Sequence, residues 1–435
     1  MRDGTLDTLY DFATGDEDAR VCRDVPDAAC KHLPRNFFAH LVALVLTKTG
    51  DRLAGAKLVL AWLLTTLGAP SFMVALLVPI RESLALIPQL FVAAMIRRQP
   101  VRKWFWIAGS AAQGLCVLGM AAVALTLKGA AAGLAIIVLL VVFSLARGVC
   151  SVSSKDVTGK TVSKNRRGVL SGYAASAAGA ITVGVGVLVW FVREQEAGSL
   201  VFFAALLGVA GVLWLLAAAA YAFIREAAGA TEGGGNAVAE ALGSLGLLTT
   251  DSGFRHFVIT RALLISTALT APFLVTLANR QGDGALTGLA VMIIANGLAA
   301  WISAPWWGKL ADRSSRRVLI IAAFAAGVLG VAVYAYAATG ASWHPVWIYA
   351  VAFFLLGIIH TGVRVGRKTY LVDMATQDNR AQYVAVSNTV IGILLLAGSA
   401  FGALASLAGV EVTILVLSVF AVAGGLSALR LAEVQ

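Results

Sequence analysis

Twelve long apolar blocks constrain the fold of this chain more than any other feature of its sequence. Each block has about 20 or more residues, the length that an α-helix needs to cross a hydrocarbon core about 30 Å thick. None of them alternates polar and apolar residues as the strands of a membrane β-barrel do. Because a backbone in lipid must satisfy its own hydrogen bonds, we expect an all-α polytopic membrane protein with twelve transmembrane helices. The blocks lie near residues 37–62, 71–96, 103–127, 131–153, 168–192, 199–224, 256–278, 285–307, 317–339, 346–367, 379–406 and 410–430.

The composition agrees with this expectation and excludes several other classes of protein. Apolar residues make up 59% of the 435 residues and charged residues only 13%, which is too little charge for the surface of a soluble enzyme of this size. The chain has no phosphate-binding loop, no HExxH sequence and no nucleophile elbow. Its four cysteines form no CxxC pair. We therefore expect no enzyme activity, no cofactor and no bound metal.

The lysines and arginines between the blocks predict the orientation of the chain. They cluster in every second loop, whereas the opposite loops carry only Lys128, Arg193 and Arg280. By the positive-inside rule, the basic loops and both termini lie in the cytoplasm. The net charge of +11 is then mostly an orientation signal, and we expect no nucleic-acid partner. The sequence predicts a multi-pass monomer in the lipid bilayer of the cytoplasmic (inner) membrane.

The polar stretches divide the chain into four parts. Residues 1–36 form an acidic N-terminal tail, and residues 225–255 form a linker that contains a run of glycines. Between and after them lie two six-helix bundles, residues 37–224 and 256–435. The loops at equivalent places in the two bundles have similar sequences, which indicates a duplicated six-helix unit, the layout of many secondary carriers.

The loop after the eighth block carries the sharpest motif of the chain. Its sequence is Gly308-Lys309-Leu310-Ala311-Asp312-Arg313-Ser314-Ser315-Arg316-Arg317. Gly308 permits close helix approach, and Asp312 can accept charge-assisted hydrogen bonds from a neighbouring helix end or an arginine. The alternative is a basic loop that only obeys the orientation rule, with Asp312 as a cap.

This loop resembles the Gly-x-Leu-Ala-Asp-Arg-x-x-Arg-Arg loop of the major facilitator superfamily (MFS), and residues 67–70 resemble its usual first outer turn. The resemblance implies the MFS fold, two pseudo-symmetric six-helix bundles that alternate access to a central site. It also implies an inner gate made by Gly308, Asp312, Arg313, Arg316 and Arg317. The first-half counterpart, residues 96–103, lacks the glycine and the aspartate, which argues against a symmetric two-loop gate.

Several charged residues fall near the middle of the first two blocks. Lys48, Asp51 and Arg52 share one face of the first predicted helix, and Arg81 and Glu82 reach a similar depth on the second. A charge at that depth is costly, so these groups should pair and face a cavity. They indicate a substrate or proton site, a structural ion-pair network such as Asp51 with Arg81, or both at once.

Four further polar residues are candidates for the same cavity. Arg147 and His360 lie on symmetry-related helices, and Asn296 and Asn388 lie at mid-membrane depth. Each has a structural alternative. Arg147 can pair with Glu82 or a helix end, His360 can be a hydrogen-bonded core histidine, and the asparagines can join helices by hydrogen bonds.

The excess of cations over acids among the mid-membrane groups favours an anionic or zwitterionic substrate. We expect a secondary active transporter that moves such a small solute by alternating access, coupled to protons through Asp51 or Glu82. Two alternatives stay open: a flippase of the same fold for lipids or lipid headgroups, and a non-transporting sensor or assembly factor on the same scaffold.

Overall fold

The computed structural model describes Tyr10 and residues 30–87, 89, 92, 95, 96, 98–163, 166–192, 200–229, 231, 245–280, 285–311, 313–339, 346–375 and 380–434. Across these residues the secondary structure is helical, with no strand. Each of the twelve predicted blocks contains at least one helix, so the predicted fold class is confirmed.

Among the described residues, the first half of the chain forms seven long or medium helices. They are α3 (Leu33–Leu53), α4 (Val59–Thr66), α5 (Ser71–Leu86), α7 (Lys103–Thr126), α8 (Gly129–Thr161), α9 (Arg167–Val192) and α10 (Leu200–Ala222). The first apolar block contains both α3 and α4, so the prediction of one continuous first helix is wrong. Helix α8 also extends well beyond the predicted end near residue 153, and its last turns contain Lys155 and Lys160.

The second half repeats this order after a short helix, α12 (Leu247–Thr250). Its helices are α13 (Ser252–Leu263), α14 (Ser266–Arg280), α15 (Ala285–Ala311), α16 (Ser315–Ala338), α17 (Val346–Met374), α18 (Arg380–Ala397), α19 (Ala400–Ala408) and α20 (Val410–Leu429). Here the seventh block is divided into α13 and α14, and the eleventh into α18 and α19.

Within the described residues, nine helical stretches are long and apolar enough to cross a membrane. The first, second and eighth blocks are not among them. The first block is interrupted and contains charges, and the second has Arg81 and Glu82 in its middle. In the eighth block, the apolar stretch that is described in full is Gly288–Ser303.

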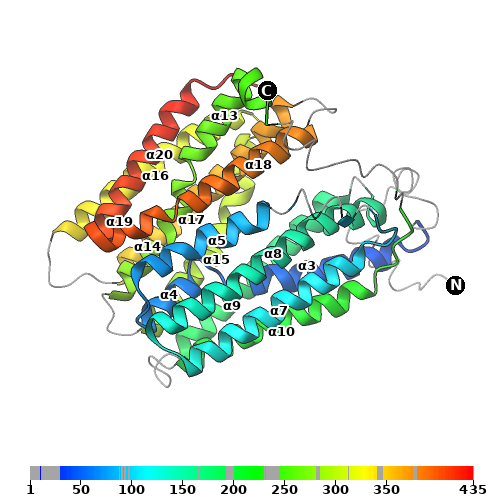
Figure 1. Cartoon of the computed structure of the whole chain (residues 1–435), viewed down its shortest axis with the longest axis horizontal. Helices are drawn as coiled ribbons and strands as arrows, with labels where there is room; N and C mark the ends of the chain where they lie inside the picture. Colours follow the sequence, from blue (N-terminus) through cyan, green and yellow to red (C-terminus); the bar gives the residue numbers. More distant parts are fainter. Residues whose placement is uncertain are drawn as a thin grey trace.

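Equivalent helices pack in the same way in the two halves. Helix α7 lies against α10 in the first half, and α16 lies against α20 in the second. The halves touch through α4 and α5 of the first with α14, α18 and α19 of the second, and through α9 with α15. Figure 1 shows that the two bundles meet around α4 and α14 and diverge toward the end of the molecule that holds both chain termini.

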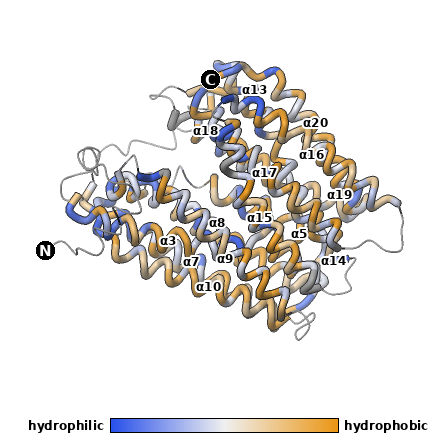
Figure 2. Tube along the Cα trace, turned by 180° about the vertical axis from the view of Figure 1, so that it is seen from behind, coloured by the Kyte–Doolittle hydropathy of each residue, from blue (hydrophilic) through white to orange (hydrophobic). Residues whose placement is uncertain are grey.

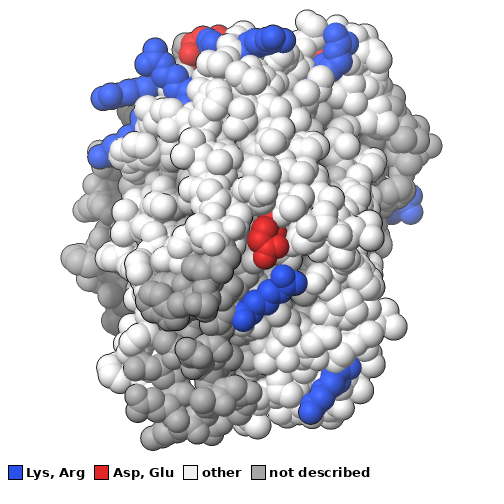
Figure 3. All heavy atoms as spheres, turned by 90° about the vertical axis from the view of Figure 1, so that its left-hand side faces the viewer, with Lys and Arg blue, Asp and Glu red and all other residues white. Residues whose placement is uncertain are grey.

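The outside of the bundles is apolar, as a lipid-facing surface requires. Large apolar side chains are widely exposed, for example Leu407 (88%), Phe191 (76%) and Val328 (71%). Hydrophilic segments concentrate near the ends of the helices (Figure 2). The face shown in Figure 3 is mostly uncharged, with basic side chains gathered along its upper edge. We call the end that carries the basic loops the basic end.

Candidate functional site

The first helix is broken where it passes the middle of the molecule. Helix α3 ends at Leu53 and α4 begins at Val59, so residues 54–58 leave the helical path. Gly55 lies in this break, and its carbonyl oxygen accepts hydrogen bonds from the backbone N–H groups of Leu58 and Leu60. Non-helical backbone at membrane depth is tolerated where it lines a cavity. Gly55 and Lys57 do line one.

The seventh block has a break at the equivalent position. Helix α13 ends at Leu263 and α14 begins at Ser266. Thr267, in the first turn of α14, donates a hydrogen bond from its hydroxyl to the Leu264 carbonyl oxygen over 2.9 Å. The side chain thus satisfies a carbonyl freed by the break, and it faces the same cavity.

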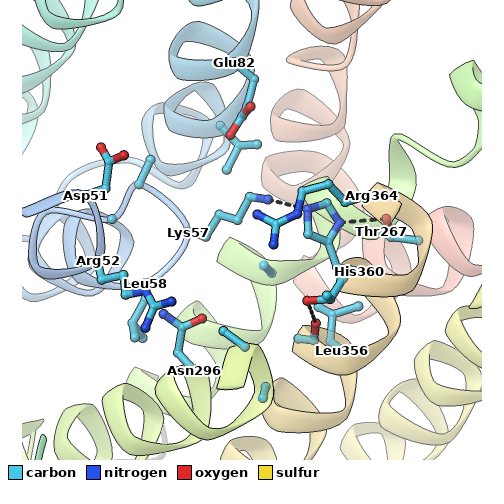
Figure 4. Close-up of a pocket in the computed structure, with 18 of the residues that line it drawn as sticks. Asp51, Arg52, Lys57, Leu58, Glu82, Thr267, Asn296, Leu356, His360 and Arg364 are labelled. Carbon is cyan, nitrogen blue, oxygen red and sulfur yellow. Dashed lines mark hydrogen bonds between the residues drawn. The ribbon is translucent and has the colours of Figure 1, made fainter. Parts of the chain in front are cut away.

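The cavity between the two halves has a volume of about 450 Å³, the size of a small-molecule site. Both halves contribute to its walls (Figure 4). Its charged lining consists of six cationic side chains and two carboxylates, an excess of four positive charges among the described residues. These side chains are Arg52, Lys57, Arg81, Arg147, Arg364 and Arg367 with Asp51 and Glu82.

Asp51 is the centre of an ion-pair network confined to the first half. Arg81 of α5 donates to Asp51 Oδ1 over 2.7 Å, and Arg147 of α8 donates to the same oxygen. Arg81 also donates to the Ala54 carbonyl oxygen, at the break in the first helix. The predicted Asp51–Arg81 pair is therefore present, and Arg147 pairs with Asp51 instead of Glu82. The network fixes α3, α5 and α8 relative to one another.

A second chain of hydrogen bonds crosses from one half to the other. Lys57 Nζ lies 3.0 Å from His360 Nε2, and His360 Nδ1 lies 3.1 Å from Thr267 Oγ1. Because the Thr267 hydroxyl donates to Leu264, it accepts from Nδ1–H, which leaves Nε2 as the acceptor for the Lys57 ammonium group. His360 thus lies in the cavity wall as a neutral imidazole and accepts a hydrogen bond from Lys57, which lies in the break of the first helix (Figure 4).

The remaining charged groups of the cavity have no direct partner. Among the described residues, Glu82 makes no hydrogen bond or ion pair, although Lys57 is its strongest electrostatic neighbour. Arg52 points toward Asn296 in Figure 4, and its Nη1 is buried without a hydrogen-bond partner. Arg364 and Arg367 likewise make no ion pair within the described part of the chain. These three arginines come from both halves and line the cavity, and none of them forms an ion pair among the described residues.

Most of the site residues predicted from the sequence come together here. The cavity is lined by Asp51, Arg52, Arg81, Glu82, Arg147, Asn296 and His360. Lys48 instead lines a neighbouring cavity of about 240 Å³ inside the first half, which shares Asp51 and Arg147 with the central one. Asn388 accepts a hydrogen bond over 2.9 Å from Arg261, and this contact is the structural alternative considered for the asparagines.

Five residues of this region were not among the site residues predicted from the sequence: Lys57, Arg261, Thr267, Arg364 and Arg367. The tenth block was predicted to end near residue 367, where basic residues are explained by the orientation of the chain. Helix α17 in fact continues to Met374, so Arg367 lies on its inner face one turn after Arg364. The signal available in the sequence was the spacing of His360, Arg364 and Arg367, which are four and then three residues apart and so favour one helix face.

The motif loop at the basic end is only partly described, because Asp312 lies outside the described residues. A Cβ atom at Gly308 would meet no described atom within 4 Å, so the expected close helix approach is not seen at this glycine. Arg316 donates to the Leu429 carbonyl oxygen over 2.6 Å, and the backbone N–H of Arg317 donates to Ser314. Arg313 is exposed. The motif arginines of this structure bind within the second half, and the gate stays a prediction.

In each half, a glutamate that follows the last helix binds the N-terminus of another helix, which is α7 in the first half and α16 in the second. In the first half, Glu226 accepts from the backbone N–H groups of Arg102 and Lys103 and pairs with Lys160 over 3.0 Å, with its side chain fully buried. In the second half, Glu433 accepts from the Ser314 hydroxyl over 2.9 Å, and Ser314 caps α16. Both carboxylates lie at positive helix N-termini. Arg102 also pairs with Asp156, so the loop without the motif has its own ion pairs.

At the basic end, Asp251 connects α13 to α18. Its side chain caps α13 by accepting from the Phe254 N–H over 2.9 Å, and it also accepts from the Tyr383 hydroxyl. The Tyr383 hydrogen bond, followed by the backbone hydrogen bond, lowers the pKa of the Asp251 carboxyl below its usual value. The same contact raises the pKa of Tyr383 to about 12.

Comparison with known proteins agrees with this architecture. The Major Facilitator Superfamily model matches residues 257–434. A POT family transporter in complex with a thioalcohol-conjugated peptide is 11% identical, with a TM-score of 0.68 over 89% of this chain and 94% of the transporter. The inward-open xylose transporter XylE from E. coli is 11% identical, with a TM-score of 0.64 over 91% and 95%. The nucleoside transporter NupG is 13% identical, with a TM-score of 0.63 over 90% and 99%. No curated protein matches the sequence.

Fold and cavity together define a class: a helical membrane protein with two related six-helix halves around a central polar site. The second half of the chain, residues 257–434, matches the Major Facilitator Superfamily model, and the chain has the fold of the solved transporters named above. The structural neighbours named above are transporters, not enzymes.

Proposed function

We propose that this protein is a secondary active transporter for a small anionic or zwitterionic solute. It would work by alternating access in the cytoplasmic membrane and be coupled to protons. The observation that carries the proposal is the charge of the central cavity, where six cationic side chains and two carboxylates face about 450 Å³ of space. An excess of positive charge in a low-dielectric site attracts an anionic group and opposes a cation.

The pairing of these charges supports a division of roles. Arg81 and Arg147 are occupied by Asp51, whereas Arg52, Arg364 and Arg367 make no ion pair among the described residues. The unpaired arginines come from both halves and face the cavity, so they are our candidates for binding the solute. Their guanidinium groups are suited to bidentate contact with carboxylate or phosphate.

Glu82 is our candidate for proton coupling. Protonating Asp51 requires breaking its contacts with two guanidinium groups, whereas the Glu82 carboxylate has no direct partner to lose among the described residues. Its nearest influences are the positive charges of Lys57, Arg147, Arg81 and Arg367. An anionic solute that binds these same cations competes with the Glu82 carboxylate, so solute binding and protonation of Glu82 favour each other.

The orientation is proposed from the basic loops. If they lie in the cytoplasm, the ends of the halves that diverge in Figure 1 also face the cytoplasm, and the structure is an inward-facing state. One structural neighbour, a POT family transporter, is solved with 5-aminolevulinic acid. At 12% identity this neighbour supports the fold alone, so the substrate class rests on the charges of the cavity.

Uptake into proteoliposomes tests the proposal. Purified protein is reconstituted and offered radiolabelled carboxylates, amino acids and phosphate esters, with and without an inward proton gradient. We expect uptake of at least one anionic or zwitterionic compound, stimulated by the gradient, and none of a cation of similar size. Glu82→Gln should lose the response to the gradient and keep exchange of solute without it. Glu411→Gln, in the first turn of α20 and outside the cavity, is the matched control.

Other outcomes would point to the alternatives. Transfer of labelled lipid between leaflets without solute uptake indicates a flippase. Neither solute nor lipid movement indicates a non-transporting protein. A full proton response in both Glu82→Gln and Asp51→Asn contradicts the proposed coupling.

A further inference from the structure

A smaller side pocket lies next to the central cavity, mainly within the second half. Its volume is about 40 Å³, more than the ~10–15 Å³ that a single water molecule needs. Apolar side chains of α14 and α18, such as Ile265, Ile391 and Leu395, form part of its wall. The pocket shares Lys57, Glu82, His360 and Arg367 with the central cavity, so a group in the central cavity can extend into it.

Arg261 of α13 is the distinctive residue of this pocket. It is only 7% exposed, and its Nη1 and Nη2 donate to Ser387 over 2.6 Å and to Asn388 over 2.9 Å. Both partners are neutral, and the Arg261 Nε–H is buried without a hydrogen-bond partner. A guanidinium group in such a place is costly unless an anion compensates it, because burial removes its hydration. Within the described part of the chain, Arg261 therefore lacks both a counter-charge and one hydrogen-bond acceptor.

Two more cations line the same pocket. Arg367 makes no hydrogen bond or ion pair in the part of the chain that the structure describes, and Lys57 gives one of its three N–H groups to the neutral His360. Glu82 is the one carboxylate in the described lining, and it has no direct contact with any of these cations. Three positive charges and one negative charge thus surround the side pocket, whose walls are partly apolar. Low polarity strengthens the attraction of this space for an anion.

We propose that the side pocket binds one small anionic group, of carboxylate or halide size, between Arg261 and Arg367. The anion accepts the free Arg261 Nε–H and neutralises part of the charge excess. This inference rests on the proposed function, because the transport of a solute is what would bring the anion to the pocket. It is either the carboxylate end of the transported solute, reaching in from the central cavity, or an inorganic anion bound beside the solute.

Thermal unfolding of the purified protein in detergent tests the site without measuring transport. The protein is held in potassium gluconate, whose anion is too large for the pocket, and gluconate is replaced by formate or by chloride at constant ionic strength. We expect a saturable rise in the unfolding temperature of ~1–3 °C at an anion concentration ten times Kd. An unfolding temperature that is the same in gluconate, formate and chloride overturns the proposal.

Variants assign the effect to the pocket. Arg261→Gln should remove the saturable rise, and Arg367→Gln should raise Kd by about tenfold or more, the effect of losing ~1.4 kcal/mol of binding. Arg430→Gln, the same substitution at an exposed arginine of the second half, should bind as the wild type does. If Arg261→Gln does not fold, Arg261→Lys replaces it, since lysine keeps the charge and loses the planar set of donors. An unchanged Kd in both pocket variants overturns the proposal.

The two probes distinguish the sources of the anion. Binding of formate without chloride assigns the pocket to a carboxylate of the solute, and binding of chloride assigns it to an inorganic anion. Because the measurement is made in detergent, a protein that transports nothing can still show the site. A protein without the site can still show uptake in proteoliposomes, so the two proposals fail separately.

Discussion

The two halves of this protein have the same order of helices but hold their buried charges differently. In the first half, Asp51 binds Arg81 and Arg147, so the charges of three helices form one compact network. In the second half, Arg261 binds only neutral partners, and Arg364 and Arg367 make no ion pair among the described residues. Duplication of the fold has therefore not duplicated the electrostatics.

This difference indicates which half holds its shape and which half offers charge to a ligand. An arginine that already donates to a carboxylate must lose that contact before it can bind an anion, whereas an unpaired arginine has no such contact to lose. The first half thus has a fixed interior, and the second half contributes more of the free binding energy for an anion. The predictions below test this comparison in order of decreasing effect.

The largest effect is expected from breaking the network of the first half. Asp51→Asn leaves Arg81 and Arg147 without their counter-charge and should lower the free energy of unfolding by ~3 kcal/mol, at the low end for a broken buried pair because Arg147 is partly exposed. Thermal and denaturant unfolding in detergent measure it. The double variant Asp51→Asn/Arg147→Gln should lose less than the sum of the two single variants. Additive losses would contradict a shared network.

The glutamate of the first half, Glu226, should contribute more to stability than its counterpart in the second half, Glu433. Glu226 is fully buried and binds two backbone N–H groups and Lys160, whereas Glu433 accepts from the Ser314 hydroxyl. Glu226→Gln should cost ~2 kcal/mol of stability, the typical value for a hydrogen bond to a charged group. Glu433→Gln should cost ~0.5 kcal/mol, since the amide oxygen can still accept. Unfolding temperatures of the two variants compare them, and equal losses would remove this asymmetry.

A smaller effect is expected at the hydrogen bond between Lys57 and His360, which crosses from one half to the other. His360→Leu removes the acceptor for Lys57 and should cost ~1 kcal/mol, mainly because the ammonium group loses a partner in the cavity. His360→Gln is the control, since its amide oxygen can accept a hydrogen bond. The measurement is the unfolding temperature of both variants in the same detergent. If His360→Gln is as unstable as His360→Leu, the hydrogen bond does not account for the loss.

The smallest effect is expected from Asp251, which lies near the surface. Its pKa is lowered in the folded state, so its ionisation stabilises the protein fully above the unfolded-state pKa of 3.8, and this contribution disappears as the pH falls through the folded-state pKa. Asp251→Asn keeps the capping acceptor for Phe254 and removes the charge. The wild type should unfold at a slightly higher temperature than the variant at pH 6, and the difference should be smaller at pH 3. A difference that is the same at both pH values would exclude ionisation as its cause.

Much of the fold could be predicted because a bilayer imposes one strong requirement, long apolar helices, which the sequence shows directly. The break at residues 54–58 could not be predicted in this way. Its sequence remains mostly apolar, and a single glycine such as Gly55 occurs inside many continuous helices. After the break, α4 packs against α14 of the other half, a long-range contact that the local sequence does not show.

The candidate site was predictable to a similar degree. Asp51, Arg81 and Arg147 were found because a charge inside an apolar block requires a partner. Arg261 and Arg367 were missed because they lie near the ends of blocks, where a basic residue has an ordinary explanation in the orientation of the chain. Only the three-dimensional structure shows that both of them face inward, toward the side pocket.

The interruptions in the first and seventh blocks have a mechanical consequence. A continuous helix resists bending because each turn is closed by backbone hydrogen bonds, but at residues 54–58 and 264–265 part of that stiffness is already absent. The outer pieces α4 and α14 pack against each other. The two interruptions are therefore the places in these helices where backbone hydrogen bonding opposes bending least.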